Sequence, residues 1–114
     1  MTVALPDGRR VDLAYFVEWR PYLWQRPVAR AFEYLGDLRG RRVLEIGGRS
    51  GWMSSLMALM GAHVTMLERG PVDQAIEEVH RWRVEDRVRL FHTSGEFDAV
   101  AGQRFDVLFT KSVL

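Results

Sequence analysis

The sequence predicts an α/β domain built on a mostly parallel sheet with flanking helices. Three observations support this class. From residue 41 onward, short apolar runs of strand length alternate with segments of helical periodicity. The connections between them are short, which favours parallel strands joined by right-handed crossovers. A glycine-rich turn follows the first apolar run, at the position where such sheets bind ligands.

The composition is that of one folded domain. The chain has 114 residues, of which 47% are hydrophobic and 27% charged, so a single core is expected and disorder is not. It has no cysteine, which excludes disulfides, thiolate metal sites and a cysteine nucleophile. A net charge of +1, with the basic residues spread among the acids, gives no electrostatic case for nucleic acid. We expect a cytoplasmic location without membrane contact, because neither a signal peptide nor a membrane-spanning run is visible.

Residues 1–40 form a separate segment, rich in aromatic side chains, that we expect to be helical. Because proline starts or breaks helices, Pro21 and Pro27 predict a short helix, a turn, and a second helix from Pro27 to Tyr34 that closes near Gly36. An aromatic cluster in this segment has two open interpretations, a lid over a ligand site or a packing block against the sheet. Its members are Tyr15, Phe16, Trp19, Tyr22 and Trp24.

Residues 41–114 supply the predicted sheet as a partial domain. Four apolar runs predict its strands: RRVLEI, AHVTMLE, RVRLFH and RFDVLF. SGWMSSLMALMG, between the first two runs, predicts a helix that is apolar nearly all round and ends at Gly61. Its methionines are expected to fill the core. A short helix is expected near residues 97–100.

The segment GPVDQAIEEVHRWRV predicts an amphipathic helix. Gly70 is its expected N-cap, and Pro71 lies in its first turn. On the exposed side, Glu77 and Arg81 have the spacing of an i,i+4 ion pair. The residues expected on its inner face are Ala75, Ile76 and Val79.

The fourth apolar run predicts a strand buried on both faces with a neighbour on each side. Since an exposed apolar edge is an aggregation template, we expect the domain to be truncated after this strand. Three explanations stay open: a shortened gene product, a half that pairs with a second polypeptide, and a dimer that covers the edge. The first is favoured, because residues 112–114 look like the start of another helix.

The stretch VLEIGGRSGW carries the candidate site. Glu45 lies near the end of the first strand, and the glycines Gly47, Gly48 and Gly51 allow a ligand to approach the backbone at the start of the next helix. Glu68 ends the second strand, where a carboxylate can accept both hydroxyls of an adenosine ribose. Together they favour a nucleoside site over a simple tight turn. Neither the dinucleotide fingerprint nor the P-loop pattern matches.

This arrangement resembles the class I S-adenosylmethionine-dependent methyltransferases, whose domain is Rossmann-like. Their first motif reads acid-x-Gly-x-Gly-x-Gly, and EIGGRSG matches it except that Arg49 replaces the middle glycine. The resemblance extends over HVTMLE and RFDVLFTKSVL, so it covers most of residues 41–114. It implies that the Gly47–Gly51 turn lies against the methionine part and ribose of the cofactor. It also implies that Glu45 lies near the cofactor amino group and that Glu68 holds the ribose hydroxyls.

The resemblance implies further contacts with the cofactor. The loop after the third strand, with Ser94, Gly95 and Glu96, is expected to meet the adenine ring, where family members often place an aspartate against the exocyclic amine. Thr110 and Lys111, after the fourth strand, are expected near the reacting methyl group. Arg49 leaves two possibilities open. Either the backbone there has a negative φ, or the arginine places a cation beside the cofactor carboxylate.

The function implied is methyl transfer from S-adenosylmethionine to a small-molecule or carbohydrate-like acceptor, with this chain supplying the cofactor-binding half. Family members continue for three further strands that hold much of the substrate site. No general base is assigned, because transfer from an activated sulfonium needs mainly proximity and orientation. No metal is expected either, since the three histidines have no ligand spacing.

Two other functions stay open. One is a non-catalytic half-domain that pairs through its open sheet edge with a partner, either a second copy or a complementary chain. The other, a nicotinamide-dependent oxidoreductase, lacks its glycine fingerprint.

Overall fold

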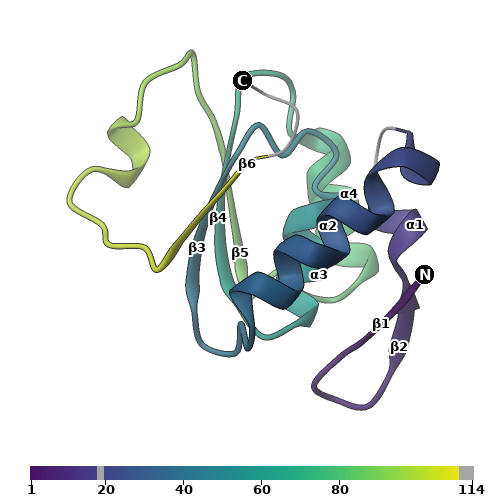
Figure 1. Cartoon of the computed structure of the whole chain (residues 1–114). Coiled ribbons are helices and arrows are strands. Elements are labelled where there is room, and N and C mark those ends of the chain that lie inside the picture. Colours follow the sequence, from purple (N-terminus) through teal and green to yellow (C-terminus); the bar gives the residue numbers. More distant parts are fainter. Residues whose placement is uncertain (18–19, 111–114) are drawn as a thin grey trace.

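A computed structural model describes residues 1–17 and 20–110 of the chain. A four-stranded parallel sheet has the order β5-β4-β3-β6, and a separate two-stranded hairpin pairs β1 with β2. Helices α2, α3 and α4 lie on one side of the sheet, and the segment with η1 lies on the other (Figure 1). The predicted α/β class with a Rossmann-like parallel sheet is confirmed. The elements are β1 (Thr2–Ala4), β2 (Arg10–Asp12), α1 (Leu13–Phe16), α2 (Pro21–Leu35), β3 (Arg42–Ile46), α3 (Trp52–Leu59), β4 (His63–Glu68), α4 (Asp73–Arg81), β5 (Val88–His92), η1 (Asp98–Val100) and β6 (Val107–Thr110).

The strand register sorts the side chains into two faces. Val43 pairs with Val64 and Val107, and Val64 pairs with Val88, so these four valines share one face. All four are buried in the core, on the side that the helices cover. On the opposite face Leu108 of β6 is 64% exposed. The helix-covered face therefore holds the core.

Helix α3 forms as expected from its apolar sequence. Met53 and Met57 are buried, which confirms that they fill the core. Gly61 closes the segment with a φ of 97°, a conformation that suits glycine. The chain enters β4 two residues after Gly61, at His63.

Helix α2 differs from the expectation of two short helices. It is one continuous helix from Pro21 to Leu35, with Pro27 inside it, and it ends at Gly36 as predicted. Proline removes one backbone hydrogen bond from a helix interior, but Pro27 is exposed, and the next turn is buried through Val28 and Phe32. Tertiary packing of these side chains outweighs the local preference of proline.

Helix α4 begins later than expected. Its N-cap is Val72 rather than Gly70, because the helix starts at Asp73 and Pro71 lies outside it. The carbonyl of Gly70 instead accepts a hydrogen bond from Nδ1 of His92, at 2.9 Å. This contact ties the segment before α4 to the end of β5.

The inner face of α4 also differs from the expectation. Ala75 and Val79 are buried as predicted, but Ile76 is 42% exposed, and Glu78 is buried in its place. Arg81 pairs with Glu78 at 3.2 Å and not with Glu77. The pattern of apolar residues misses this arrangement, because a buried glutamate is stable only with partners that the fold brings to it.

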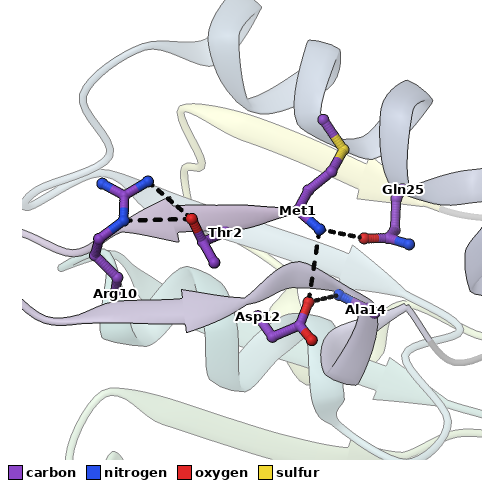
Figure 2. Close-up of polar contacts among 6 residues, drawn as sticks. All are labelled: Met1, Thr2, Arg10, Asp12, Ala14 and Gln25. Atoms are coloured by element: carbon purple, nitrogen blue, oxygen red, sulfur yellow. Dashed lines mark hydrogen bonds and ion pairs between the residues drawn. The ribbon is translucent and has the colours of Figure 1, made fainter.

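The hairpin of β1 and β2 was not expected from the sequence. Figure 2 shows how polar contacts hold it to the helices. The amino group of Met1 lies 3.0 Å from Oε1 of Gln25 on α2 and 3.8 Å from Oδ1 of Asp12. The same Asp12 oxygen accepts a hydrogen bond from the backbone of Ala14, which caps α1. The hairpin is therefore fixed relative to α1 and α2.

The aromatic residues of α1 pack against α3 and the end of α4. Tyr15 stacks on Trp52, with ring centroids 5.6 Å apart, and Phe16 lies 5.1 Å from Trp82. For these two residues the structure favours the packing block over the lid. Tyr22 is 76% exposed and takes no part in this packing. Trp19 lies outside the described residues.

Candidate functional site

The predicted site residues gather at the carboxyl ends of the strands in the four-stranded sheet. All pairs among β3 to β6 are parallel, so their carboxyl ends lie together. β3 has β4 on one side and β6 on the other. The strand order therefore reverses at β3, because the chain passes to β4 and β5 on one side and then returns to β6 on the other. Open α/β sheets bind ligands in the crevice outside the carboxyl ends at such a switch point.

The glycine turn between β3 and α3 needs each of its glycines for a different reason. Gly47 has a φ of 76°, and its N–H donates to the carbonyl of Leu67 on β4 at 2.8 Å. A Cβ on Gly48 would lie 2.3 Å from Sδ of Met66. Gly51, with a φ of 74°, lets the start of α3 approach Ala75, whose Cβ would be 2.8 Å from an added Cβ. The turn is therefore locked between β4 and α4.

Arg49 adopts the conformation of the glycine that it replaces. Its φ is 49°, so the possibility of a negative φ at this position is wrong. The side chain is exposed and forms no ion pair with any described residue. The turn thus keeps the backbone path of a glycine and adds a cation to it.

Glu45 lies beneath the turn rather than at its surface. It is 3% exposed, and its Oε1 accepts a short hydrogen bond from the hydroxyl of Ser54 on α3. A Cβ on Gly48 would lie 2.9 Å from the same oxygen. This geometry gives Glu45 a role in positioning the turn. Its contact with the cofactor amino group stays a prediction.

Two side chains that support the turn were missed by the sequence analysis. Ser54 binds Glu45, and Gln74 of α4 accepts a hydrogen bond from the hydroxyl of Ser50 at 2.9 Å. Ser54 had a visible signal, because Ser54 and Ser55 are two polar residues in an otherwise apolar helix that starts at the turn. Gln74 had none, because only the packing of α4 brings it to the turn.

Glu68 lies at the end of β4, beside the turn. Its neighbour in the strand, Leu67, accepts the hydrogen bond from Gly47, and its own carbonyl accepts one from the N–H of Thr93 at 2.9 Å. The residue is 8% exposed. A carboxylate in this place can accept two hydroxyl groups of a ribose that enters from the edge.

The loop after β5 is ordered around Glu96. The hydroxyl of Thr93 donates to the backbone carbonyl of Glu96 at 2.6 Å, and the N–H of Ser94 lies 3.3 Å from its Oε1. Backbone N–H groups of Glu96 itself and of Ser94 lower the pKa of the Glu96 carboxyl. Gly95 has a φ of 114° and permits the tight turn. Glu96 is therefore ionised at neutral pH and can accept a hydrogen bond from an amine.

Thr110 lies with the other predicted site residues at the carboxyl ends of the strands. It ends β6 and pairs with Ile46, so it lies beside the residue that precedes the glycine turn. Its side chain is exposed. Lys111, which was expected near the reacting methyl group, lies outside the described residues.

The chemistry of these residues fits S-adenosylmethionine. Helix α3 has no side-chain cap at its N-terminus, and Arg49 adds a positive charge there, which suits the single carboxylate of this cofactor. Glu68 suits its ribose hydroxyls, and Glu96 suits the amine of its adenine. These donors and acceptors are thus complementary to the charged and polar groups of the cofactor.

Metal-binding clusters and membrane-spanning helices are both absent from the described residues. These residues contain no cluster of three or more metal-binding side chains. His63, His80 and His92 are exposed and lie on different elements. Within residues 1–17 and 20–110, no helix is long and apolar enough to cross a bilayer.

The fold is that of the class I methyltransferases. A family model described as "Methyltransferase domain" matches residues 16–113, and the chain belongs to this family. It is 34% identical over 74 residues to the ubiquinone biosynthesis O-methyltransferase of Azotobacter vinelandii. That match covers 62% of this chain and 31% of the relative, so the chain spans about a third of the relative's length.

Solved structures share the fold. YjhP from E. coli matches 88% of this chain and 42% of its own, with a TM-score of 0.67 and 21% identity. The DhpI-SAH complex matches 84% of this chain and 45% of its own, with a TM-score of 0.57 and 24% identity. These likenesses establish the fold.

Proposed function

We propose that this chain supplies the S-adenosylmethionine-binding half of a methyltransferase that acts on a small-molecule or carbohydrate-like acceptor. The observation that carries the proposal is the locked glycine turn, with Arg49 upon it, beside Glu68 at the end of β4. The family match and the name of the A. vinelandii relative support methyl transfer to a small molecule. A cytoplasmic location and the absence of a nucleic-acid partner stay predictions.

In this proposal the residues act by binding and orientation. When bound, the cofactor would supply an activated methyl group for transfer to an acceptor atom. Glu68 holds the ribose, and Arg49 with the start of α3 holds the carboxylate. Glu96 accepts from the adenine amine. These residues would hold the two ends of the ligand, and Thr110 lies beside them at the end of β6.

The test is calorimetric titration of the purified chain with S-adenosylhomocysteine. We expect micromolar binding that Glu68→Ala abolishes, because the ribose loses its acceptor. Glu77→Ala on the exposed face of α4 removes the same charge outside the site and should leave binding unchanged. NADH, offered as a competitor, should not displace the ligand. A folded chain that binds NADH but not S-adenosylhomocysteine would contradict the proposal.

A second function is supported by the edge strand. Among the described residues β6 pairs only with β3, and Leu108 on it is 64% exposed. A non-catalytic half-domain could use this edge to pair with a partner chain. Such a protein would associate through β6, and this association would be unchanged in the Glu68→Ala variant.

A further inference from the structure

The amino-terminal edge of the sheet, opposite the glycine turn, carries two adjoining hollows. The larger has a volume of about 650 Å³ and lies between the β1–β2 turn, the segment before β3 and the segment after α4. The smaller, of about 110 Å³, lies at the first residues of β3, β4 and β5. Both are lined by His63, Asp86 and Arg87, so they form one continuous surface, which we call the arginine groove.

Positive charge is concentrated in this groove. The whole chain has a net charge of only +1, yet six arginines line the groove against two aspartates, Asp7 and Asp86. The arginines come from the hairpin, from the loops before β3 and after α4, and from β3 and β5. They are Arg9, Arg39, Arg42, Arg83, Arg87 and Arg89.

Most of these charges are not neutralised by residues that the structure describes. Arg9 pairs with Asp7 and Arg39 pairs with Asp37, each at 2.7 Å. The other four arginines form no ion pair with any residue that the structure describes. Their guanidinium groups are available to an external anion.

Two of the four unpaired guanidinium groups lie over aromatic rings. Cζ of Arg42 lies 5.7 Å from the ring centroid of Phe105, and Cζ of Arg89 lies 5.3 Å from that of Phe91. An arginine on an aromatic ring keeps its N–H edge free for paired oxygen atoms. These donors are therefore partly ordered before any ligand binds.

Arg83 adds a strained position to the groove. Its φ is 57°, at a helix end where the N–H of Arg83 donates to the carbonyl of His80 and the N–H of Val84 to that of Val79. Glycine adopts this conformation without strain, and no ion pair within the described residues offsets the cost. Helix C-termini attract cations, which accounts for Arg83 beside α4 but not for Arg42 and Arg89 on the strands.

We propose that the arginine groove binds a ligand that carries two phosphate groups. Guanidinium groups bind phosphate oxygens in pairs, and unpaired arginines lie in both hollows. The groove is a different site from the glycine turn, because β4, of six residues at about 3.3 Å each, separates the two edges by roughly 20 Å. The ligand with two phosphate groups would therefore bind away from the glycine turn. This inference does not depend on the proposed function.

The test is calorimetric titration with sodium pyrophosphate at constant ionic strength. We expect saturable binding that weakens at least tenfold in Arg87→Gln, since Arg87 lines both hollows. Arg30→Gln on the exposed side of α2 makes the same charge change elsewhere and should alter binding less than twofold. Arg83→Gly should also weaken binding while raising the thermal midpoint, so that loss of the fold does not explain the effect.

Three results would overturn the inference. They are the absence of saturable pyrophosphate binding, equal weakening by Arg30→Gln and Arg87→Gln, and citrate binding as tight as that of pyrophosphate. Adenosine diphosphate serves as a second ligand. Tighter binding of this nucleotide than of pyrophosphate identifies a nucleotide as the source of the phosphates, and equal binding identifies a free diphosphate.

Discussion

Arg49 holds a conformation that an arginine disfavours, in the turn that joins β3 to α3. Its φ of 49° is that of a left-handed residue. We expect Arg49→Gly to raise the free energy of unfolding by about 1 kcal/mol, because glycine avoids this strain. The same change should weaken S-adenosylhomocysteine binding by about tenfold, since a charge-assisted contact to the carboxylate is lost. Urea denaturation and calorimetry measure the two effects.

Two controls separate strain from binding at Arg49. 5′-Methylthioadenosine lacks the carboxylate, so its affinity should not change in Arg49→Gly. Arg83→Gly relieves a similar strain, at a φ of 57°, outside the turn, and should leave S-adenosylhomocysteine binding intact. Equal affinity of wild type and Arg49→Gly for S-adenosylhomocysteine would show that Arg49 does not contact the carboxylate.

Gly48 tests the packing of the turn against β4. We expect Gly48→Ala to destabilise the protein by about 1 to 3 kcal/mol, the usual cost of overpacking. The added Cβ would lie 2.3 Å from Sδ of Met66, a side chain that is fully buried. Gly70→Ala is the matched control, because its Cβ would lie 3.7 Å from the nearest atom, Oε2 of Glu68. Urea denaturation that shows equal stability for both variants would refute this account of the turn.

The residues of the candidate site differ in how far the sequence predicts them. Gly47 follows one apolar run directly and Glu68 ends another, so their place at the strand ends can be derived from chain order alone. Gln74 reaches the turn only because α4 packs against α3, and that packing is not encoded in local sequence. The conformation of Arg49 was likewise open until the backbone path of the turn was known.

At the scale of elements, a buried carboxylate joins α1 to α4. Oε1 and Oε2 of Glu78 accept hydrogen bonds from the hydroxyl of Tyr15, at 3.0 and 3.1 Å, and Oε2 also accepts one from Nε1 of Trp82. We expect Tyr15→Phe to lower the free energy of unfolding by about 1 kcal/mol, below the usual range for a bond to a charged group because Tyr15 is 39% exposed. Tyr22→Phe, on an exposed tyrosine of α2, is the control.

The same contact predicts a pH dependence. Burial raises the pKa of Tyr15 above its usual value of 10.0, and the adjacent Glu78 carboxylate raises it further. The unfolded chain therefore loses this proton first, so the stabilisation is complete below about pH 10 and is lost as pH rises through the folded pKa. Urea denaturation between about pH 8 and pH 11 should show the difference between wild type and Tyr15→Phe shrinking above pH 10. A difference that grows above pH 10 would contradict this sign.

The elements show where sequence patterns suffice. The four apolar runs predict the strands, because strands buried in a parallel sheet have continuous apolar sequences. The proline rule fails for α2, since burial of Val28 and Phe32 supports a helix through Pro27. The hairpin is also missed, because its strands have three residues each and are held by contacts to distant side chains such as Gln25.

At the scale of the whole molecule, helices cover one face of the sheet and a loop with η1 lies on the other (Figure 1). The order of apolar runs predicts the α/β class but does not contain the strand order, which places β6 beside β3. That placement leaves β6 with one neighbour among the described residues. The candidate site and the exposed strand are therefore consequences of one topology.

We expect the chain to associate with a second copy through β6. Two such strands can pair antiparallel around a two-fold axis, which satisfies both edges at once, and the net charge of +1 does not oppose self-association. Leu108, 64% exposed on β6, would then be covered. Leu108→Lys should shift the protein to monomer, because a charge in the covered face is costly.

Sedimentation velocity over a concentration series measures this association. Leu23→Lys is the control, since Leu23 is an exposed leucine of α2, 52% accessible, and should not affect pairing through β6. Wild type that stays monomeric at all concentrations would rule out the second copy. Equal dissociation by Leu23→Lys and Leu108→Lys would assign the interface to general apolar exposure instead of the sheet edge. A dimer sensitive only to Leu108→Lys that still binds S-adenosylhomocysteine would show that pairing through β6 does not interfere with cofactor binding.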